Sequence, residues 1–196
     1  MARLREFDHD AVLNLAMQVF WANGYHRTSL NDLCEAMLLN RSSLYAVFGD
    51  KRALFLETID RYGDRAVTRV SAALSRPVPI HDAAAGFFTE IVDQICARPS
   101  RIGCFMGNTA TEVARHDRVV AARLRRHLGR VEAVFRDAIA QAKARGEISE
   151  HSDITALARF FVASAQGLHL IGQTTTDKAV LEDIVEMILR TLERQR

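Results

Sequence analysis

The side chains best suited to chemistry in this 196-residue chain are polar groups at the start of a short predicted helix. Arg41, Ser42 and Ser43 follow Asn40, which can cap a helix by accepting a backbone hydrogen bond from its first turn. A guanidinium and two hydroxyls in an exposed first turn can hydrogen-bond to the edges of DNA bases, as the second helix of a helix-turn-helix does. The pattern therefore predicts sequence-specific DNA recognition by these three residues.

Two further residues flank this helix and could hold a DNA phosphate. Thr28 lies just before a predicted helix cap, and its hydroxyl can donate a hydrogen bond. Lys51 begins the next helix, where its charge would add to a helix end that already favours anions. The alternative for the whole group is a set of solvated helix ends that bind no ligand.

Two short helices joined by a tight turn must hold these residues in place. Ser29 and Asp32 have the spacing of a weak capping box for the first of them. A turn over residues 38–40 then leads to a second helix over about residues 41–47, and Asp50 caps the longer helix that follows. This arrangement is a helix-turn-helix with a third helix directly after it.

The segment resembles the DNA-binding domain of the tetracycline-repressor (TetR) family of transcriptional regulators. The matching pieces, in order, are Phe20, Gly24-Tyr25, Thr28-Ser29-Leu30, Leu33, Ser43-Leu44-Tyr45, Phe48 and Lys51-Arg52-Ala53-Leu54. The resemblance implies that Tyr45 turns its hydroxyl towards the DNA backbone. One position departs from the family: Leu38 stands where glycine is usual, and leucine is strained if the turn needs a positive φ.

The resemblance also implies how the whole chain is organised. We expect an all-α protein with a three-helix helix-turn-helix domain over residues 1–50 and a helical effector-binding and dimerisation domain over residues 51–196, connected by the helix from residue 51. In TetR-like proteins the last two helices pair with their copies in a second subunit. Here these helices are predicted over about residues 153–172 and from residue 177 onwards. Their wide apolar faces alone would be more typical of an ordinary core.

The remaining segments are also expected to be helical. The predicted helices cover about residues 10–23, 51–74, 82–97, 103–115 and 118–145. An arginine-rich run over residues 115–130 could be a second nucleic-acid patch, but its arginines surround an apolar stripe, as on a solvated helix face.

Composition is that of a soluble globular protein. Hydrophobic residues make up 48% and charged residues 26%, and the net charge of +2 does not by itself indicate DNA binding. The chain has no run of about eighteen apolar residues and no signal-peptide core at its N-terminus, so we expect a cytoplasmic protein without a membrane partner. Three scattered cysteines and seven scattered histidines predict neither a disulfide framework nor a metal site, and no cofactor is expected.

Cys104 is the second candidate for chemistry. It follows Gly103 and is expected early in a helix, where the pKa of a thiol can be lowered and the thiolate can react. The segment resembles a branch of TetR-like regulators with Gly-Cys near this point, some of which sense electrophiles or oxidants. A sensor thiol would alkylate faster than Cys34 and Cys96, whereas the alternative is a small buried residue.

A small-molecule site is expected among the helices of the second domain. Its candidate lining residues are Phe88, Cys104, Phe105, Met106, Asn108 and His169. Core packing explains the apolar members equally well, and His169 has the alternative of a satisfied core or rim histidine.

Together these features predict a homodimeric transcriptional regulator without enzymatic activity. We expect a repressor that leaves a palindromic double-stranded operator when a small-molecule effector of unknown identity binds, with covalent modification of Cys104 as an alternative trigger. A helical enzyme using Cys104 as nucleophile lacks an evident paired base. A helical interaction module without DNA binding is the remaining alternative.

Overall fold

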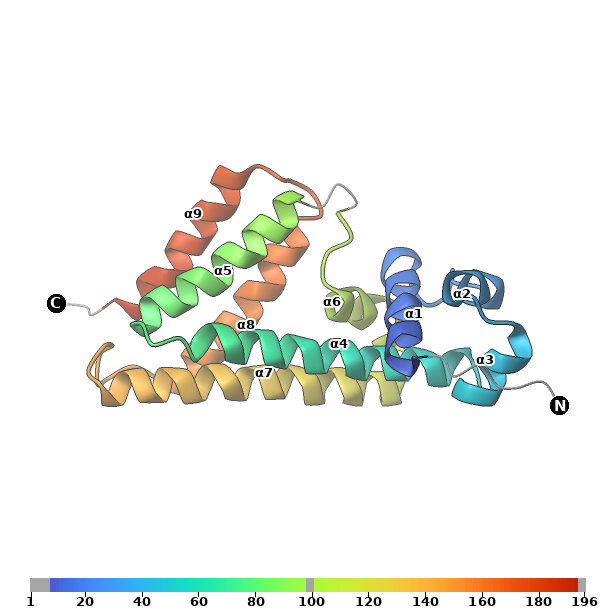
Figure 1. The fold of residues 1–196 in the computed structure, drawn as a ribbon. Coiled ribbons are helices and arrows are strands. Elements are labelled where there is room, and N and C mark those ends of the chain that lie inside the picture. Colours follow the sequence, from blue (N-terminus) through green and yellow to red (C-terminus); the bar gives the residue numbers. More distant parts are fainter. Residues whose placement is uncertain (1–7, 98–100, 194–196) are drawn as a thin grey trace.

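Two long helices, α4 (Lys51–Leu74) and α7 (Arg118–Ala144), run side by side along the length of the molecule (Figure 1). The computed structural model describes residues 8–97 and 101–193. Helices alone make up the regular structure of this part of the chain, which confirms the predicted all-α fold. The three short N-terminal helices lie at one end of the α4–α7 pair, and α5, α8 and α9 lie at the other (Figure 1).

The N-terminal end consists of α1 (His9–Asn23), α2 (Leu30–Met37) and α3 (Arg41–Phe48). Each begins at a side chain that accepts backbone N–H groups of the first turn, which fixes its start. Ser29 and Asp32 form the predicted capping box reciprocally, and Asn40 caps α3. The helix-turn-helix predicted from the sequence is therefore confirmed, with α3 one residue longer than expected.

The turn between α2 and α3 contains the leucine that departs from the family pattern. Leu38 has φ 54° and ψ 37°, a left-handed conformation, and its N–H donates to the carbonyls of Cys34 and Glu35. Its side chain is 89% exposed, so no packing compensates for the conformation. A non-glycine residue in this region is disfavoured by roughly 1–2 kcal/mol, and the positive φ on which the predicted strain at Leu38 depends is present.

The opposite end of the molecule is built from α5 (Ile80–Ala97), α8 (Ile154–Ile171) and α9 (Lys178–Leu189), which continues into a 3-10 turn, η2 (Arg190–Leu192). Helix α5 begins two residues earlier than predicted. The rings of Phe87, Phe88, Phe135 and Phe161 meet edge to face and join α5, α7 and α8.

The segment predicted as one helix over residues 103–115 is divided. It forms α6 (Phe105–Thr109) and a π-helical turn, η1 (Ala110–Ala114). The residues before it have irregular backbone: Gly103 has φ 64°, and a Cβ there would lie 2.1 Å from Gln173 Nε2. Glycine is therefore required at this position, and it prevents the helix from starting there.

Buried hydrophobic residues form two cores. The first, the N-terminal core, runs from Val12 to Tyr62 and from Cys104 to Leu124, so α6, η1 and the start of α7 pack with α1–α4. The second, the C-terminal core, runs from Val70 to Ile95 and from Phe135 to Leu192. The two cores meet along α4 and α7.

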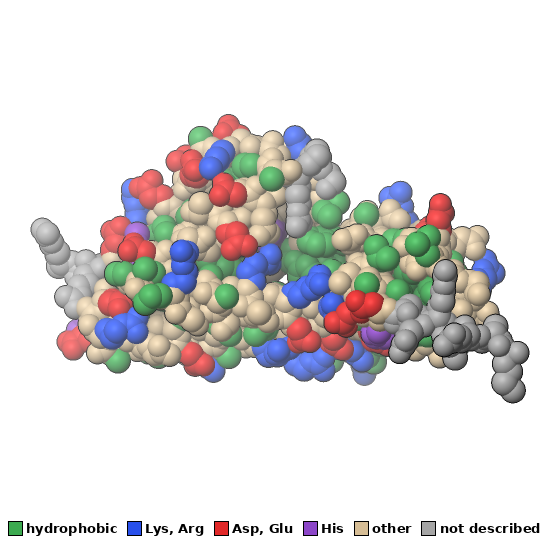
Figure 2. All heavy atoms as spheres, in the orientation of Figure 1, with side chains coloured by type: hydrophobic (Ala, Val, Ile, Leu, Met, Phe, Trp, Pro, Cys, Tyr) green, Lys and Arg blue, Asp and Glu red, His purple; other side chains and the backbone are tan. Residues whose placement is uncertain are grey.

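Ion pairs fix the register of α4 against α7. Asp60 accepts hydrogen bonds from Arg123 and Arg126 and contacts His127, and Asp64 pairs with Arg130. The residue numbers of the paired side chains differ by a nearly constant amount, from 63 to 67. The two helices therefore run in the same direction. The arginines over residues 115–130 are exposed except for half-buried Arg123, so the predicted solvated face is confirmed, with Arg123, Arg126 and Arg130 also pairing with α4. Figure 2 shows acidic and basic side chains gathered along this edge of the molecule.

Candidate DNA-binding surface and effector cavity

The first turn of α3 is exposed and preorganised. Asn40 Oδ1 accepts from the Ser43 N–H at 2.8 Å and from the Ser42 hydroxyl at 2.7 Å. Arg41 Nη2 donates to Asn31 Oδ1 of α2 at 2.8 Å, which holds the guanidinium across the turn. Arg41 and Ser42 are exposed and Ser43 is half-buried. The side chains predicted to touch bases thus lie together on one helix end.

Tyr45 lies on the same helix and is 47% exposed. Leu44 and Phe48 are buried in the N-terminal core and anchor α3 from its other side. A buried apolar face opposite an exposed polar one lets α3 present its polar side chains without losing its packing.

Thr28 does not lie where the sequence predicted. Its side chain is buried, 1% exposed, and its hydroxyl donates to the Gly24 carbonyl at 2.6 Å. This hydrogen bond closes the loop between α1 and α2. The expectation of a phosphate contact by the Thr28 hydroxyl needs correction, because the hydroxyl faces the loop backbone and is shielded from solvent.

Lys51 begins α4 and is half-buried. Its Nζ lies 4.6 Å from the centre of the Tyr25 ring, and burial lowers the pKa of its ammonium group. The neighbouring Arg52 donates to both carboxylate oxygens of Asp117. Of these two neighbours, only Lys51 is placed to meet a phosphate without breaking an ion pair.

Polar contacts connect the region of α1 to the segment around α6 and η1. Glu112 of η1 accepts from the backbone N–H of Tyr25 at 3.0 Å and of His26 at 2.8 Å. Trp21 Nε1 donates to the Gly103 carbonyl at 3.1 Å, and Arg52 of α4 pairs with Asp117 just before α7. These contacts fix the segment from Gly103 to Asp117 against α1, the loop after it and the start of α4.

A small cavity lies where α4, α5, α6, α7 and α8 approach one another. Its volume is about 50 Å³. Its walls are formed by Tyr62, Ala66, Arg69, Val70, Phe87, Ile91, Cys104, Met106, His127, Leu128, Val131, Phe135, Val162, Ala165, Gln166 and His169. Of the predicted effector residues, Cys104, Met106 and His169 line this cavity.

The other three predicted effector residues, Phe88, Phe105 and Asn108, do not line this cavity, and Phe105 and Asn108 border a separate hollow between α1 and α6. Contact between these three residues and an effector stays a prediction. Phe88 is fully buried against Phe87 and Phe161 in the C-terminal core. Phe105 is 2% exposed and packs in the N-terminal core. Asn108 Nδ2 donates to the Ile102 carbonyl at 2.6 Å and so holds the chain before α6. These side chains make the walls rigid rather than forming the cavity surface.

The polar residues of the cavity were missed by sequence reasoning. Tyr62, Arg69, His127 and Gln166 come from three helices, and their faces can be assigned only once α4 is packed against α7 and α8. Gly63 carries one usable signal, because a Cβ there would lie 2.3 Å from the His127 ring. A glycine inside a long helix indicates a close approach by a neighbour.

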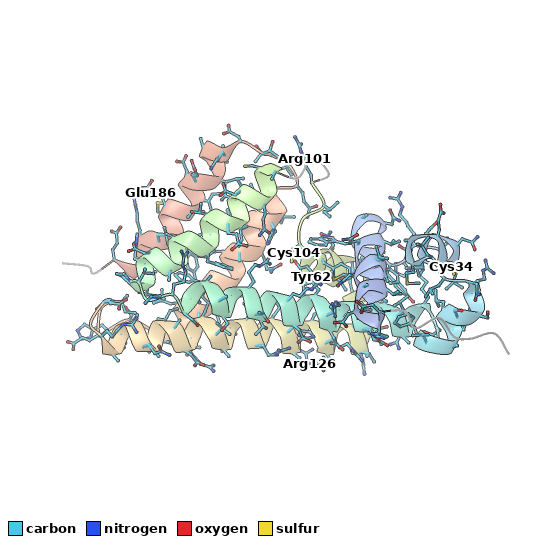
Figure 3. The ribbon with its side chains drawn as sticks, viewed as in Figure 1. Cys34, Tyr62, Arg101, Cys104, Arg126 and Glu186 are labelled. Atoms are coloured by element: carbon cyan, nitrogen blue, oxygen red, sulfur yellow. The ribbon has the colours of Figure 1, made fainter. Side chains whose placement is uncertain are left out.

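Cys104 differs from its sequence expectation in two respects. It is the N-cap residue of α6, just before the first turn, and its side chain makes no capping hydrogen bond. It is 5% exposed, whereas Cys34 and Cys96 are half-buried, so the expected order of thiol access is reversed. Its Sγ lies 3.5 Å from the Tyr62 hydroxyl, and Figure 3 shows the two side chains between α4 and α6.

Neither a metal cluster nor a clear membrane segment is evident. Within residues 8–97 and 101–193, no three or more His, Cys, Asp or Glu side chains group as metal ligands would. In the same part of the chain α8 alone has the length and hydropathy, 1.4 on average, to cross a membrane, and 22% of it is buried. Helix α8 contains Thr, Arg, Ser, Gln and His, so it is not the continuous apolar run that the prediction excluded, and core helices of soluble proteins meet the same criterion.

Comparisons with known proteins agree with this geometry. Residues 12–58 match the model for bacterial regulatory proteins of the tetR family, and residues 82–188 match the tetracyclin repressor-like C-terminal domain. The chain is 34% identical to the HTH-type transcriptional repressor ComR of Escherichia coli (strain K12) over 97% of this chain and 90% of ComR. It is also 34% identical to the uncharacterized HTH-type transcriptional regulator YezE of Bacillus subtilis (strain 168), over 98% of this chain and 100% of YezE.

A solved structure is similar over nearly the whole length. A cysteine-substituted TetR family transcriptional regulator CifR, complexed with 26-bp double-strand operator DNA, superposes with a TM-score of 0.84 at 30% identity. The match covers 96% of this chain and 98% of CifR. The chain therefore belongs to the tetR family, as the helix-turn-helix motif predicted, and is a DNA-binding transcriptional regulator.

Proposed function

We propose that this protein is a homodimeric cytoplasmic repressor that binds a palindromic double-stranded operator and leaves it when a small molecule binds. The observation that carries the proposal is the preorganised first turn of α3, with exposed Arg41 and Ser42 beside half-buried Ser43. In this proposal these three side chains touch base edges, and Tyr45 and Lys51 contact phosphates.

The dimer is proposed from an uncovered apolar stripe on α8. Phe160, Ala163, Gly167 and Leu170 follow one another at helical spacing; Phe160 is 42% and Leu170 64% exposed. A Cβ on Gly167 would have no neighbour within 4 Å, which leaves room for a second helix to approach closely. Helix α9 adds Val180 and Met187, both exposed. A second copy is the occupant that also supplies the two recognition helices of a palindromic site.

The apolar stripe of α9 faces the interior of the subunit. Leu181, Val185 and Ile188 are buried within the subunit in the C-terminal core, and Ile184 is half-buried. The dimer contact is therefore assigned to the neighbouring face of α9, which carries Val180 and Met187.

Release by an effector is proposed through α6. Cys104 and Met106 line the cavity, and the same segment holds α1 and the loop between α1 and α2 through Gly103 and Glu112. A ligand that fits the cavity better when α6 has moved would favour a subunit arrangement that no longer matches the operator, because only differential affinity can shift such an equilibrium.

The test begins with selection of operator fragments from random double-stranded DNA by the purified protein. Lys51→Ala should weaken binding to all selected sequences. It should also reduce the slope of log affinity against log salt concentration by about one, the change expected for one lost phosphate contact. Ser43→Ala should instead change the preferred base at one position of each half-site. Arg136→Ala, on an exposed part of α7 far from α3, is the control and should bind normally. Failure to select any sequence would refute the proposal.

A covalent trigger is a second candidate because the Cys104 thiol lines the cavity, 3.5 Å from the Tyr62 hydroxyl. An electrophile small enough to enter the cavity would then modify Cys104 and release DNA, while Cys104→Ser would stay bound. Mass spectrometry of the native protein decides between the two triggers. Modification of only Cys34 and Cys96, the more exposed thiols, would exclude the covalent one.

A further inference from the structure

Arg69 brings an unmet hydrogen-bond donor to the cavity. Its Nη1 donates to Gln94 Oε1 at 3.3 Å. Its Nε is buried and has no hydrogen-bond partner among the described residues, and no other buried side-chain nitrogen or oxygen in those residues shares this property. A buried N–H without an acceptor is unfavourable, so the Nε–H beside the cavity indicates a ligand group that accepts its hydrogen bond.

The remaining charge near the cavity is already balanced. The His127 ring lies among charged side chains of α4 and α7: its Nδ1 is 3.2 Å from Arg130 Nη1, and its Nε2 is 2.8 Å from Asp60 Oδ1 and 3.4 Å from Arg126 Nη2. Asp60 also pairs with Arg123 and Arg126 between α4 and α7, so its negative charge is balanced there.

No carboxylate offsets Arg69 inside the cavity. Its walls contain no Asp or Glu, and Gln94 meets Arg69 with a neutral amide. The surface facing a ligand is thus apolar along Phe87, Ile91 and Phe135, with a positive charge at one side. This combination suits a molecule with an apolar body and a negatively charged acceptor.

We propose that the cavity binds small organic anions, with a carboxylate accepting from Arg69 Nε and an aliphatic body lying against Phe87, Ile91 and Val162. This inference rests on the proposed function in taking the cavity as the effector site. The volume of about 50 Å³ restricts the body to a few carbon atoms unless the walls move. An uncharged analogue can accept the hydrogen bond but leaves the positive charge of Arg69 unbalanced. A ligand with an ammonium group is repelled by that charge.

Isothermal titration of the DNA-free protein with matched probes tests the proposal. Butyrate, butyramide and n-butylamine have the same carbon chain and differ in charge. Butyrate should bind at least about 10-fold more tightly than butyramide, the ratio expected for one charge-assisted hydrogen bond, and n-butylamine should not bind. Sodium chloride alone should give no saturable heat. Equal affinities for butyrate and butyramide, or no binding of either, would mean that water satisfies Arg69 and would overturn the proposal.

Arg69→Met keeps an apolar stem and removes the donor. It should abolish the preference for butyrate over butyramide while leaving the melting temperature of the ligand-free protein unchanged or higher. Arg65→Met, one turn earlier on an exposed part of α4, is the matched control and should keep the preference. A preference that survives in Arg69→Met contradicts the assignment. If that variant does not fold, Arg69→Gln replaces it. Because DNA is absent, the result is independent of operator binding, whose failure would appear only in the selection experiment.

Discussion

The N-terminal and C-terminal cores are held together by similar contacts but differ in how much apolar surface they leave uncovered. Long-range polar contacts tie the elements of the N-terminal core: Glu112 to the Tyr25 and His26 N–H groups, Trp21 to Gly103, and Arg52 to Asp117. The C-terminal core has polar contacts of its own, from the Ile80 N–H to Glu147 and from Lys178 to Asp93, and aromatic rings pack in both cores. The C-terminal core leaves large apolar side chains on α8 and α9 exposed, which the N-terminal core does only at Leu15, Leu38 and Tyr45 among the described residues of α1–α3 and their turns.

This difference separates two structural tasks. Hydrogen bonds are directional, so the contacts around Glu112 fix the angle at which α2 and α3 are presented. Apolar packing is less directional, and an unfinished apolar surface can be completed by another copy. Directional hydrogen bonds therefore orient the end that must fit DNA, whereas the end proposed to dimerise keeps an exposed apolar surface.

The sharpest comparison uses two adjacent phenylalanines of α8. Phe161 is fully buried and Phe160 is 42% exposed. Phe161→Ala should destabilise the folded protein by about 3–5 kcal/mol, because it leaves a cavity in the C-terminal core. Phe160→Ala should change unfolding of the monomer by under about 1 kcal/mol but shift the monomer–dimer equilibrium towards monomer. Urea unfolding and sedimentation velocity measure the two effects; an unaltered dimer in Phe160→Ala would remove this residue from the interface.

Removing the Glu112 contact should loosen the N-terminal core alone. Glu112→Ala leaves two backbone N–H groups without their carboxylate and should lower the free energy of unfolding by about 1–3 kcal/mol. Hydrogen exchange at the Tyr25 and His26 amides should accelerate. Glu186→Ala is the control, since Glu186 of α9, labelled in Figure 3, forms an exposed pair with Arg190 of η2 worth under about 0.5 kcal/mol. Unchanged exchange at both amides would contradict the role given to Glu112.

A pH series isolates the charge of Asp117. Burial raises the pKa of its carboxyl, but hydrogen bonds from the Val120 and Val119 N–H groups and from Arg52 outweigh this, and the pKa is lowered overall from 3.8. A carboxyl with a depressed folded-state pKa adds stability above its unfolded pKa, and this stability is lost as pH falls through the folded value. As the pH falls below 3.8, the free energy of unfolding should therefore decrease more steeply for wild type than for Asp117→Asn. Parallel curves would show that the charge contributes nothing.

The smallest effect is expected in the turn. Glycine adopts a positive φ without strain, so Leu38→Gly should remove the strain of a leucine in this conformation. Glycine also gives the unfolded chain more freedom, which offsets part of the effect. The free energy of unfolding is therefore expected to rise by about 0.5–1 kcal/mol. Leu39→Gly should destabilise instead, because Leu39 packs against the N-terminal core. Thermal unfolding of the two variants decides; a loss of stability in Leu38→Gly would mean that the left-handed conformation is not strained.

Local signals made the helix-turn-helix predictable. Ser29, Asn40 and Asp50 accept hydrogen bonds from residues two or three positions ahead, so their capping role can be read from the sequence. The positive φ at Leu38 was also predictable, because it depends on the short turn between the two helices. Thr28 was misjudged because its hydroxyl had two available partners, a phosphate and the Gly24 carbonyl, and only the folded loop distinguishes them.

What the sequence by itself determined is therefore the set of helices, their caps and the family to which the chain belongs. The tertiary structure decided which side chains face the cavity: Arg69, Tyr62 and His127 are separated from Cys104 by more than a helix in sequence and meet only when α4 packs against α7 and α6. The physical reason is the range of the interactions. Capping and amphipathic spacing act within a turn or two of chain, whereas a buried polar site depends on where distant helices place their faces and on which charges they neutralise.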